Sequence, residues 1–116
     1  MQPEPQIVKL LVANGLRPAE ARTLACWNED DDELTQLDME NIAGLRQPEV
    51  SLAVCEMRRR GWLRQIAKRK PERGAPVKVY TLAIPMRDIV REIVAERTRE
   101  IDQAQELTVQ LLQAVA

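Results

Sequence analysis

The chain has no histidine and only two cysteines, Cys26 and Cys55, among its 116 residues. Histidine is the usual general base near neutral pH and the commonest metal ligand, and a zinc site of the CxxC kind needs closely spaced cysteines. The sequence therefore lacks the side chains on which most acid–base catalysis and zinc binding depend. We expect no catalytic residue, no metal site and no cofactor, so the chain is predicted not to be an enzyme.

Long apolar runs are also missing. No stretch approaches the roughly 18 consecutive apolar residues that indicate a membrane-spanning helix. The first residues, MQPEPQ, lack the basic and then apolar layout of a signal peptide. With 45% hydrophobic residues, the chain can fill the core of one compact domain. These features predict a soluble globular protein of the cytoplasm, with no membrane partner.

The net charge of -1 conceals an uneven distribution along the chain. Residues 1–43 hold three basic and nine acidic side chains, residues 44–80 hold ten and three, and residues 81–116 hold four and six. The basic excess in the middle of the chain is the pattern that attracts phosphate. A solvated charged surface would explain the same counts without a partner, so charge alone leaves both readings open.

Two short helices are expected at the start of the chain. An apolar face formed by Ile7, Leu10, Leu11 and Ala13 stops at Asn14-Gly15, a pair that ends helices. Pro18 then suits the first turn of a second helix, because its missing N–H would have had no partner there. The acidic run at residues 29–33 is predicted to be a surface linker.

A helix-turn-helix is expected next. Thr35 can cap a third helix that ends at Gly44, and Pro48 suits the first turn of a fourth helix over residues 47–60. The apolar residues of the third helix are Leu37, Met39 and Ile42. Two helices joined by a short turn that contains glycine form a helix-turn-helix, whose second helix commonly lies in the major groove of DNA.

A β-hairpin with a basic tip follows the helices. Residues 62–67 and 77–82 are predicted strands, and the connection between them, KRKPERGAP at residues 68–76, is rich in basic residues, proline and glycine. Helix-turn-helix, hairpin and helix in this order form the winged-helix layout, in which the hairpin tip reaches toward the DNA backbone or an adjacent groove. This layout favours the interpretation that the basic residues of the middle segment contact DNA.

Two stretches resemble known regulators. NGLRPAEARTLACW, from Asn14, resembles the opening of archaeal TrmB-type regulators, and LTQLDMENIAGLRQPEVSLAVCEMRRRGWL, from Leu34, is similar to the helix-turn-helix of TrmB-, MarR- and ArsR-type transcription factors. The resemblance covers residues 7–83. It implies a sequence-specific DNA-binding repressor or activator that is usually dimeric. The metal-sensing cysteine and histidine set of ArsR-type proteins is missing, so the resemblance supplies no effector.

Helical geometry predicts which side of the fourth helix faces DNA. At about 100° per residue, Val50, Ala53, Val54 and Met57 form one apolar side that packs on the core. Gln47 and Ser51 can hydrogen-bond base edges, and Arg59 can reach guanine or phosphate. The alternative for each of these residues is a solvated surface position. The expected DNA contacts of this helix are Arg46, Gln47, Pro48, Ser51, Leu52, Cys55 and Arg59.

The hairpin tip is expected to position the protein on DNA rather than to read its sequence. Basic side chains that contact phosphates supply most of the sequence-independent affinity. The residues expected in this role are Lys68, Arg69, Lys70 and Arg73. The alternative is a hairpin tip whose charges only increase solubility. Arg58 and Arg60 are expected instead to interact with the C-terminal end of the helix dipole.

Residues 85–116 are predicted to form one helix, because Pro85 can start it and no later proline or glycine interrupts it. Its apolar residues recur at alternating steps of three and four, with Arg97 and Thr108 as polar interruptions, which favours a coiled coil with another copy. The alternative is a monomer in which this helix folds back over Ile7, Leu10 and Leu11. The expected dimer interface consists of Val90, Val94, Ile101, Ala104, Leu111 and Val115.

The sequence therefore predicts an α+β protein with a winged helix-turn-helix domain at residues 1–84 and a C-terminal dimerisation helix at residues 85–116. Its expected function is that of a transcriptional regulator that binds double-stranded DNA as a homodimer at an inverted repeat. The alternative is a winged-helix module for protein–protein interaction in a larger assembly. Cys26 is expected to be buried and Cys55 to lie at the DNA face, where a redox role for its thiol stays open.

Overall fold

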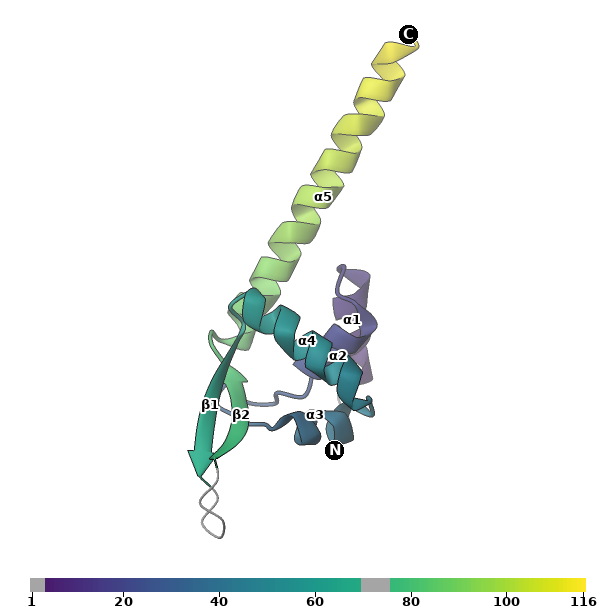
Figure 1. The fold of residues 1–116 in the computed structure, drawn as a ribbon. Helices are drawn as coiled ribbons and strands as arrows, with labels where there is room; N and C mark the ends of the chain where they lie inside the picture. Colours follow the sequence, from purple (N-terminus) through teal and green to yellow (C-terminus); the bar gives the residue numbers. More distant parts are fainter. Residues whose placement is uncertain (1–3, 70–75) are drawn as a thin grey trace.

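The structure of the protein is a computed structural model that describes residues 4–69 and 76–116 (Figure 1). Its elements, in chain order, are α1 (Pro5–Ala13), α2 (Pro18–Leu24), α3 (Gln36–Ala43), α4 (Gln47–Arg59), β1 (Leu63–Arg69), β2 (Pro76–Leu82) and α5 (Met86–Ala114). Short helices, a two-stranded antiparallel wing and a long C-terminal helix form a winged helix-turn-helix. The α+β class and the order of elements expected from the sequence are confirmed.

Local sequence signals explain how α3 and α4 begin and end. The Thr35 hydroxyl accepts a hydrogen bond of 3.0 Å from the Asp38 N–H, and the Thr35 N–H donates one of 2.9 Å to the Asp38 carboxylate. This reciprocal cap satisfies two N–H groups at the start of α3. Gly44 ends α3 with φ 66°, a left-handed conformation that favours glycine, and Pro48 lies in the first turn of α4.

Leu37, one of the apolar residues of α3, does not face the core. Its side chain is 63% exposed, whereas Met39 and Ala43 of the same helix are buried. Leu37 and Met39 are two residues apart, which on an α-helix places them on nearly opposite sides. The apolar character of Leu37 therefore does not indicate that it faces the core.

The wing is a regular hairpin that runs from the pair Leu63–Leu82 to the pair Arg69–Pro76. β1 is longer than expected, since Lys68 and Arg69 belong to the strand rather than to the turn. A further bridge joins Leu34 to Tyr80 of β2, with N–H to O distances of 2.9 and 2.8 Å between the two residues. The segment before α3 therefore adds a minimal third strand that the sequence did not predict.

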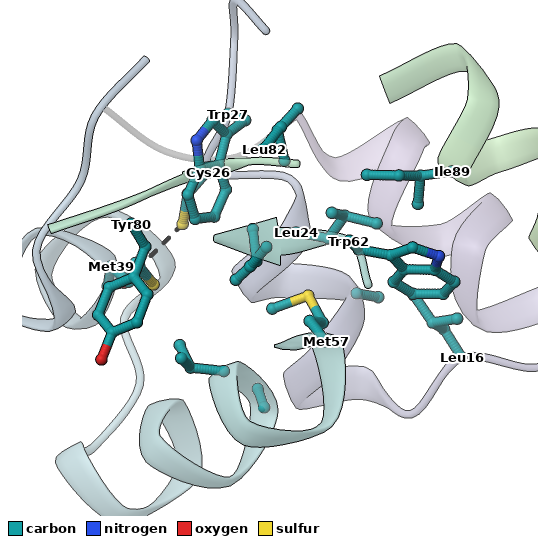
Figure 2. Packing of buried hydrophobic residues seen from close by; sticks show 14 of the residues in the cluster. Leu16, Leu24, Cys26, Trp27, Met39, Met57, Trp62, Tyr80, Leu82 and Ile89 are labelled. Atoms are coloured by element: carbon teal, nitrogen blue, oxygen red, sulfur yellow. Dashed lines mark hydrogen bonds between the residues drawn. The ribbon is translucent and has the colours of Figure 1, made fainter. Parts of the chain in front are cut away.

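The core lies where α2, α3, α4, the wing and the first turns of α5 meet (Figure 2). One side of α4 contributes Val50, Ala53, Val54 and Met57, all buried as expected. Leu24, Trp62 and Ile89 converge on them from α2, the start of the wing and α5. The burial of Ile89 and Ile93 means that α5 begins as part of this core.

Beyond its first turns, α5 leaves the rest of the molecule and extends into solvent (Figure 1). Residues 98–116 are all exposed, and the longest dimension of the protein is 74 Å. The alternative in which this helix folds back over α1 is therefore not the arrangement adopted. Among the helices of the described residues, none has both the length and the apolar character that crossing a bilayer requires.

Leu24 and Leu37 form a matched pair for testing the core. Leu24→Ala removes a fully buried side chain and is expected to lower the free energy of unfolding by about 2–5 kcal/mol, because it leaves a cavity. Leu37→Ala changes an exposed position on another short helix and should stay within about 0.5 kcal/mol. Urea unfolding at one fixed chain concentration measures both. Equal losses for the two variants would contradict the described facing of α3.

Candidate nucleic-acid interface

The outer face of α4 is a ridge of exposed side chains opposite its buried face. Pro48, Leu52, Cys55 and Arg59 all lie on this outer face, as the sequence predicted. Leu52 is 73% exposed although it is apolar. Gln47 is exposed at the start of the helix and Ser51 is half-buried at the edge of the ridge. Successive turns of α4 therefore present polar, apolar and cationic side chains on the same exposed face.

Two grooves flank this ridge. One, of about 510 Å³, lies between the start of α2 and α4, and the other, of about 420 Å³, lies between α4, Gln36 of α3 and Tyr80 of β2. Cys55 and Arg59 line both grooves. Since both sides are hollowed, the outer face of α4 projects between the two grooves.

Arg59 is engaged within its own helix. Its Nε donates hydrogen bonds of 2.8 and 3.0 Å to the Glu56 carboxylate, and Arg60 Nε lies 3.7 Å from the same carboxylate. The hydrogen bond from Arg59 lowers the pKa of Glu56, with the charges of Arg59 and Arg60 acting in the same direction. The acidic side chain of Glu56 on α4 is thus neutralised by two guanidinium groups.

Arg46 and Glu49 form a second neutralised pair at the start of α4. The Arg46 N–H donates a hydrogen bond of 3.1 Å to the Glu49 carboxylate, and the Arg46 Nε lies 3.7 Å from it. The carboxylate caps the helix N-terminus, where it also complements the helix dipole. The side chain of Arg46 is 90% exposed, so it remains accessible to a ligand while the Glu49 carboxylate accepts from its backbone N–H.

The other two arginines at the end of α4 have structural partners. Arg58 Nη1 donates a hydrogen bond of 3.0 Å to the Gln65 side chain of β1. The Arg60 guanidinium lies 4.8 Å from the centre of the Trp62 ring and 3.5 Å from a Glu96 oxygen of α5. Both residues therefore connect α4 to its neighbours, which is a more specific role than the expected interaction with the helix dipole.

The wing carries further basic residues. Lys68 forms an ion pair with Glu33, whereas Arg64 and Lys78 are exposed on the strands. The sequence interpretation missed Arg64 and Lys78, although the alternation of Lys78 with two valines in β2 indicates an outward position. The side chain of Arg69, and all of Lys70 and Arg73, lie outside the described residues.

The acidic linker at residues 29–33 has structural functions that its composition did not reveal. Asp30 accepts a hydrogen bond of 3.1 Å from the Met86 N–H and so caps the start of α5. Asp32 accepts bonds of 3.1 and 3.0 Å from the N–H groups of Asn28 and Glu29. The acidic residues therefore stabilise the fold around the basic surface.

A second candidate surface is the exposed apolar stripe of α5. Its expected members are all exposed, five on the helix and Val115 at its C-cap: Val90, Val94, Ile101, Ala104, Leu111 and Val115. Near the base of α5, Val90 and Val94 also line an apolar groove of about 570 Å³ together with Ile7 and Leu10 of α1. Further exposed apolar residues that the sequence interpretation omitted are Leu107, Val109 and Leu112.

Among the described residues, no group of three or more histidine, cysteine, aspartate or glutamate side chains is arranged to hold a metal ion. The two thiols differ in environment. Cys26 is buried, and burial raises the pKa of its thiol to about 11, because desolvation disfavours the thiolate. Cys55 is exposed on the ridge of α4, as expected.

Comparisons with solved structures place the fold. A protein from Methanosarcina mazei Go1 described as a possible transcriptional regulator aligns with a TM-score of 0.63 and 18% identity, over 91% of this chain and 87% of that chain. The adhesin competence repressor AdcR of Streptococcus pyogenes aligns at 0.45, with 18% identity over 92% and 75% of the two chains. A MarR family transcription regulator aligns at 0.48, with 15% identity over 94% and 71%.

The alignment at 0.63 shows that the winged helix-turn-helix fold is shared with a regulator-like protein. No family model and no curated protein matches the sequence.

The different environments of the thiols predict selective labelling. Near neutral pH, iodoacetamide should modify Cys55 in the native protein and leave Cys26 protonated and inaccessible. Mass spectrometry of the intact chain is therefore expected to show one adduct before unfolding and two after unfolding in urea. Cys55→Ser should remove the native adduct. A Cys55→Ser protein that is labelled at the parent rate would place the accessible thiol at Cys26 instead.

Proposed function

We propose that this chain is a sequence-specific DNA-binding transcriptional regulator. In this proposal residues 47–60 enter the major groove, and the tip of the wing, at residues 68–76, contacts the DNA backbone. The observation that carries the proposal is the projecting ridge of α4, which lies between two grooves in the most basic segment of the chain. The winged helix-turn-helix fold supports the same function by analogy.

The ridge offers side chains suited to reading bases. Gln47 and Ser51 at its N-terminal end can donate to and accept from base edges, and Leu52 can contact a thymine methyl group. The proposed contacts along α4 are Arg46, Gln47, Pro48, Ser51, Leu52, Cys55 and Arg59. The opposite, apolar face of α4 is buried in the core, so the ridge keeps one orientation relative to the rest of the protein.

Two acidic residues of α4, Glu49 and Glu56, do not oppose this function, because arginines already compensate their charges. Glu56 is bound by Arg59 and approached by Arg60, and Glu49 is held by Arg46. The proposed phosphate contacts come from Lys68, Arg69, Lys70 and Arg73, with the exposed Arg64 and Lys78 on the same hairpin. The excess positive charge of residues 44–80 is then available to attract the DNA phosphates.

We further propose that the protein binds as a homodimer held by the apolar stripe of α5. The stripe is exposed along most of a 29-residue helix, and the solvent exposure of so many apolar side chains is unfavourable. A two-fold dimer presents two copies of α4 in opposite directions, so the preferred DNA site is an inverted repeat.

Selection of binding sites from randomised duplexes, followed by salt titration, tests DNA binding. The logarithm of affinity for the selected site should fall steeply with the logarithm of salt concentration. Lys70→Ala with Arg73→Ala is expected to weaken binding to all duplexes similarly and to flatten the slope by about 0.9 for each phosphate that the variant no longer neutralises. Binding insensitive to salt would favour the protein–protein module over the regulator.

Gln47→Ala serves as the matched control in the same titration. This change removes no charge, so the salt slope should stay at the parent value. Discrimination at particular base pairs should relax by about 1–3 kcal/mol if Gln47 makes a bidentate contact. Undiminished discrimination by the Gln47→Ala protein would mean that another face of α4 meets the bases.

The dimer is tested by placing charge in the stripe. Ile101→Asp with Leu111→Asp should give monomers that keep a folded winged domain and bind only half-sites weakly, because burying the carboxylates between helices is strongly unfavourable. Gln103→Asp with Gln113→Asp adds the same charge to α5 outside the stripe and should leave the dimer intact. Light scattering with half-site and full-site titrations distinguishes the outcomes. A full dimer of the Ile101/Leu111 variant would locate the interface elsewhere.

A further inference from the structure

The apolar stripe of α5 and the groove beside α1 form one continuous surface. Val90 and Val94 line the groove together with Ile7 and Leu10 of α1. The same two valines begin the stripe, and Ile101 follows them at helical steps of seven and eleven residues, which return to the same side of the helix. A helix that covers the stripe from the distal end of α5 therefore enters the groove when it reaches the base.

The two polar residues of the stripe indicate the direction of the covering helix. In an antiparallel pair centred between Asp102 and Gln103, the stripe forms four kinds of layer: Val90 with Val115, Val94 with Leu111, Arg97 with Thr108, and Ile101 with Ala104. The polar interruptions then face one another, and all the remaining layers are apolar on both sides. In a parallel pair each residue would face its own copy, so Arg97 would face Arg97.

The chemistry of the polar layer favours the antiparallel pair. The Thr108 hydroxyl donates its proton to the Ala104 carbonyl at 2.9 Å, which leaves its oxygen free to accept a hydrogen bond. Arg97 is a pure donor, and its Nη1 lies 3.2 Å from a Glu100 oxygen of its own helix. An arginine opposite a threonine gains an acceptor on the partner helix, whereas two opposed arginines offer one another no acceptor and repel one another.

The charge distribution along α5 points the same way. Residues 86–99 contain four arginines and three acidic side chains, whereas residues 100–116 contain three acidic side chains and no basic one. An antiparallel pair places the acidic half of each helix beside the half that holds all the arginines. Opposite helix directions also bring the unlike ends of the two helix dipoles together.

We propose that α5 pairs with α5 of a second copy in the antiparallel direction, with the final turns of the partner's helix seated in the groove between α1 and α5. The partner's Leu111 and Val115 then cover Val94 and Val90, and Ile7 and Leu10 of α1 form the opposite wall. This inference rests on the proposed pairing through α5 and is independent of DNA binding. It explains why α1, a surface helix, leaves Ile7 and Leu10 46% and 51% exposed.

Crosslinking with a short bismaleimide tests the direction of the pair. The background is Cys55→Ser, which removes the exposed thiol and leaves the buried Cys26. Val94→Cys together with Leu111→Cys should give a covalent dimer, since the two thiols share a layer. Each single variant should give none, because in the antiparallel pair identical positions lie about 26 Å apart along the helix. Residues 94 and 111 are both exposed in the single chain, so neither change threatens folding.

A covalent dimer from either single variant would show a parallel pair and overturn the proposal. A dimer in light scattering with no covalent product from the double variant would also overturn it, because the interface would then lie elsewhere. A monomeric parent protein would refute both this inference and the proposed homodimer. DNA binding is measured separately, so its loss or retention bears on the regulator function alone.

Charge rescue provides a second measurement that needs no crosslinker. Thr108→Arg places two arginines in one layer and should raise the dimer dissociation constant about tenfold or more, because opposed like charges repel. Adding Arg97→Glu restores opposite charges within that layer only when the helices are antiparallel, so the double variant should return to within about threefold of the parent. In a parallel pair the double variant opposes like charges in two layers, and a failure of rescue would contradict the antiparallel arrangement.

Discussion

The packing of α4 against the core constrains the candidate interface more than any other feature of the protein. Val50 and Met57 are essentially inaccessible on one side of the helix, and burial of each large apolar side chain stabilises the fold by about 1.5–3 kcal/mol. Rotating α4 by a single position would expose these residues and bury charged ones. The outward direction of Leu52, Cys55 and Arg59 is therefore a consequence of core packing. Because apolar contacts on the opposite face hold α4 in place, the exposed side chains of the ridge are not needed for its packing and are available for the proposed DNA contacts.

A second constraint connects this ridge to α5. The Trp62 Nε1 lies 3.4 Å from a Glu92 oxygen, and Arg60 stacks on the Trp62 ring while it approaches Glu96 of α5. Exposed ion pairs contribute little stability, so the energy of the joint comes mainly from the burial of Trp62 and Ile89. The polar contacts join the end of α4 and the start of the wing to α5. The orientation of α4 is thereby linked to the helix through which the proposed dimer forms.

The features that the sequence predicted are those with local causes. Thr35 and Pro48 mark helix starts through their own backbone chemistry, and the buried side of α4 follows from helical periodicity. The features it did not predict depend on distant partners: the Leu34–Tyr80 bridge joins residues 46 positions apart, and Asp30 caps a helix that begins 56 positions later. The pairing of Glu56 with Arg59 does not depend on a distant partner, because the two residues are three positions apart on one helix. This spacing can be read from the sequence.

In the proposed dimer, the polar layer of α5 connects the direction of the helix pair to the spacing of the proposed DNA half-sites. Leucine or valine at positions 97 and 108 would add apolar contact, but a uniform stripe would fit parallel and antiparallel partners alike. With Arg97 and Thr108 present, one direction is favoured at some cost in stability. The antiparallel pair then separates the two copies of Ile89, where α5 joins each core, by about 40 Å along the helix axis. This separation is comparable to the ~34 Å turn of B-DNA that two-fold regulators span. A parallel pair would instead bring both winged domains to the same end of the coil. In the proposed antiparallel dimer, two side chains of the stripe therefore determine which spacing of half-sites fits, without touching the DNA.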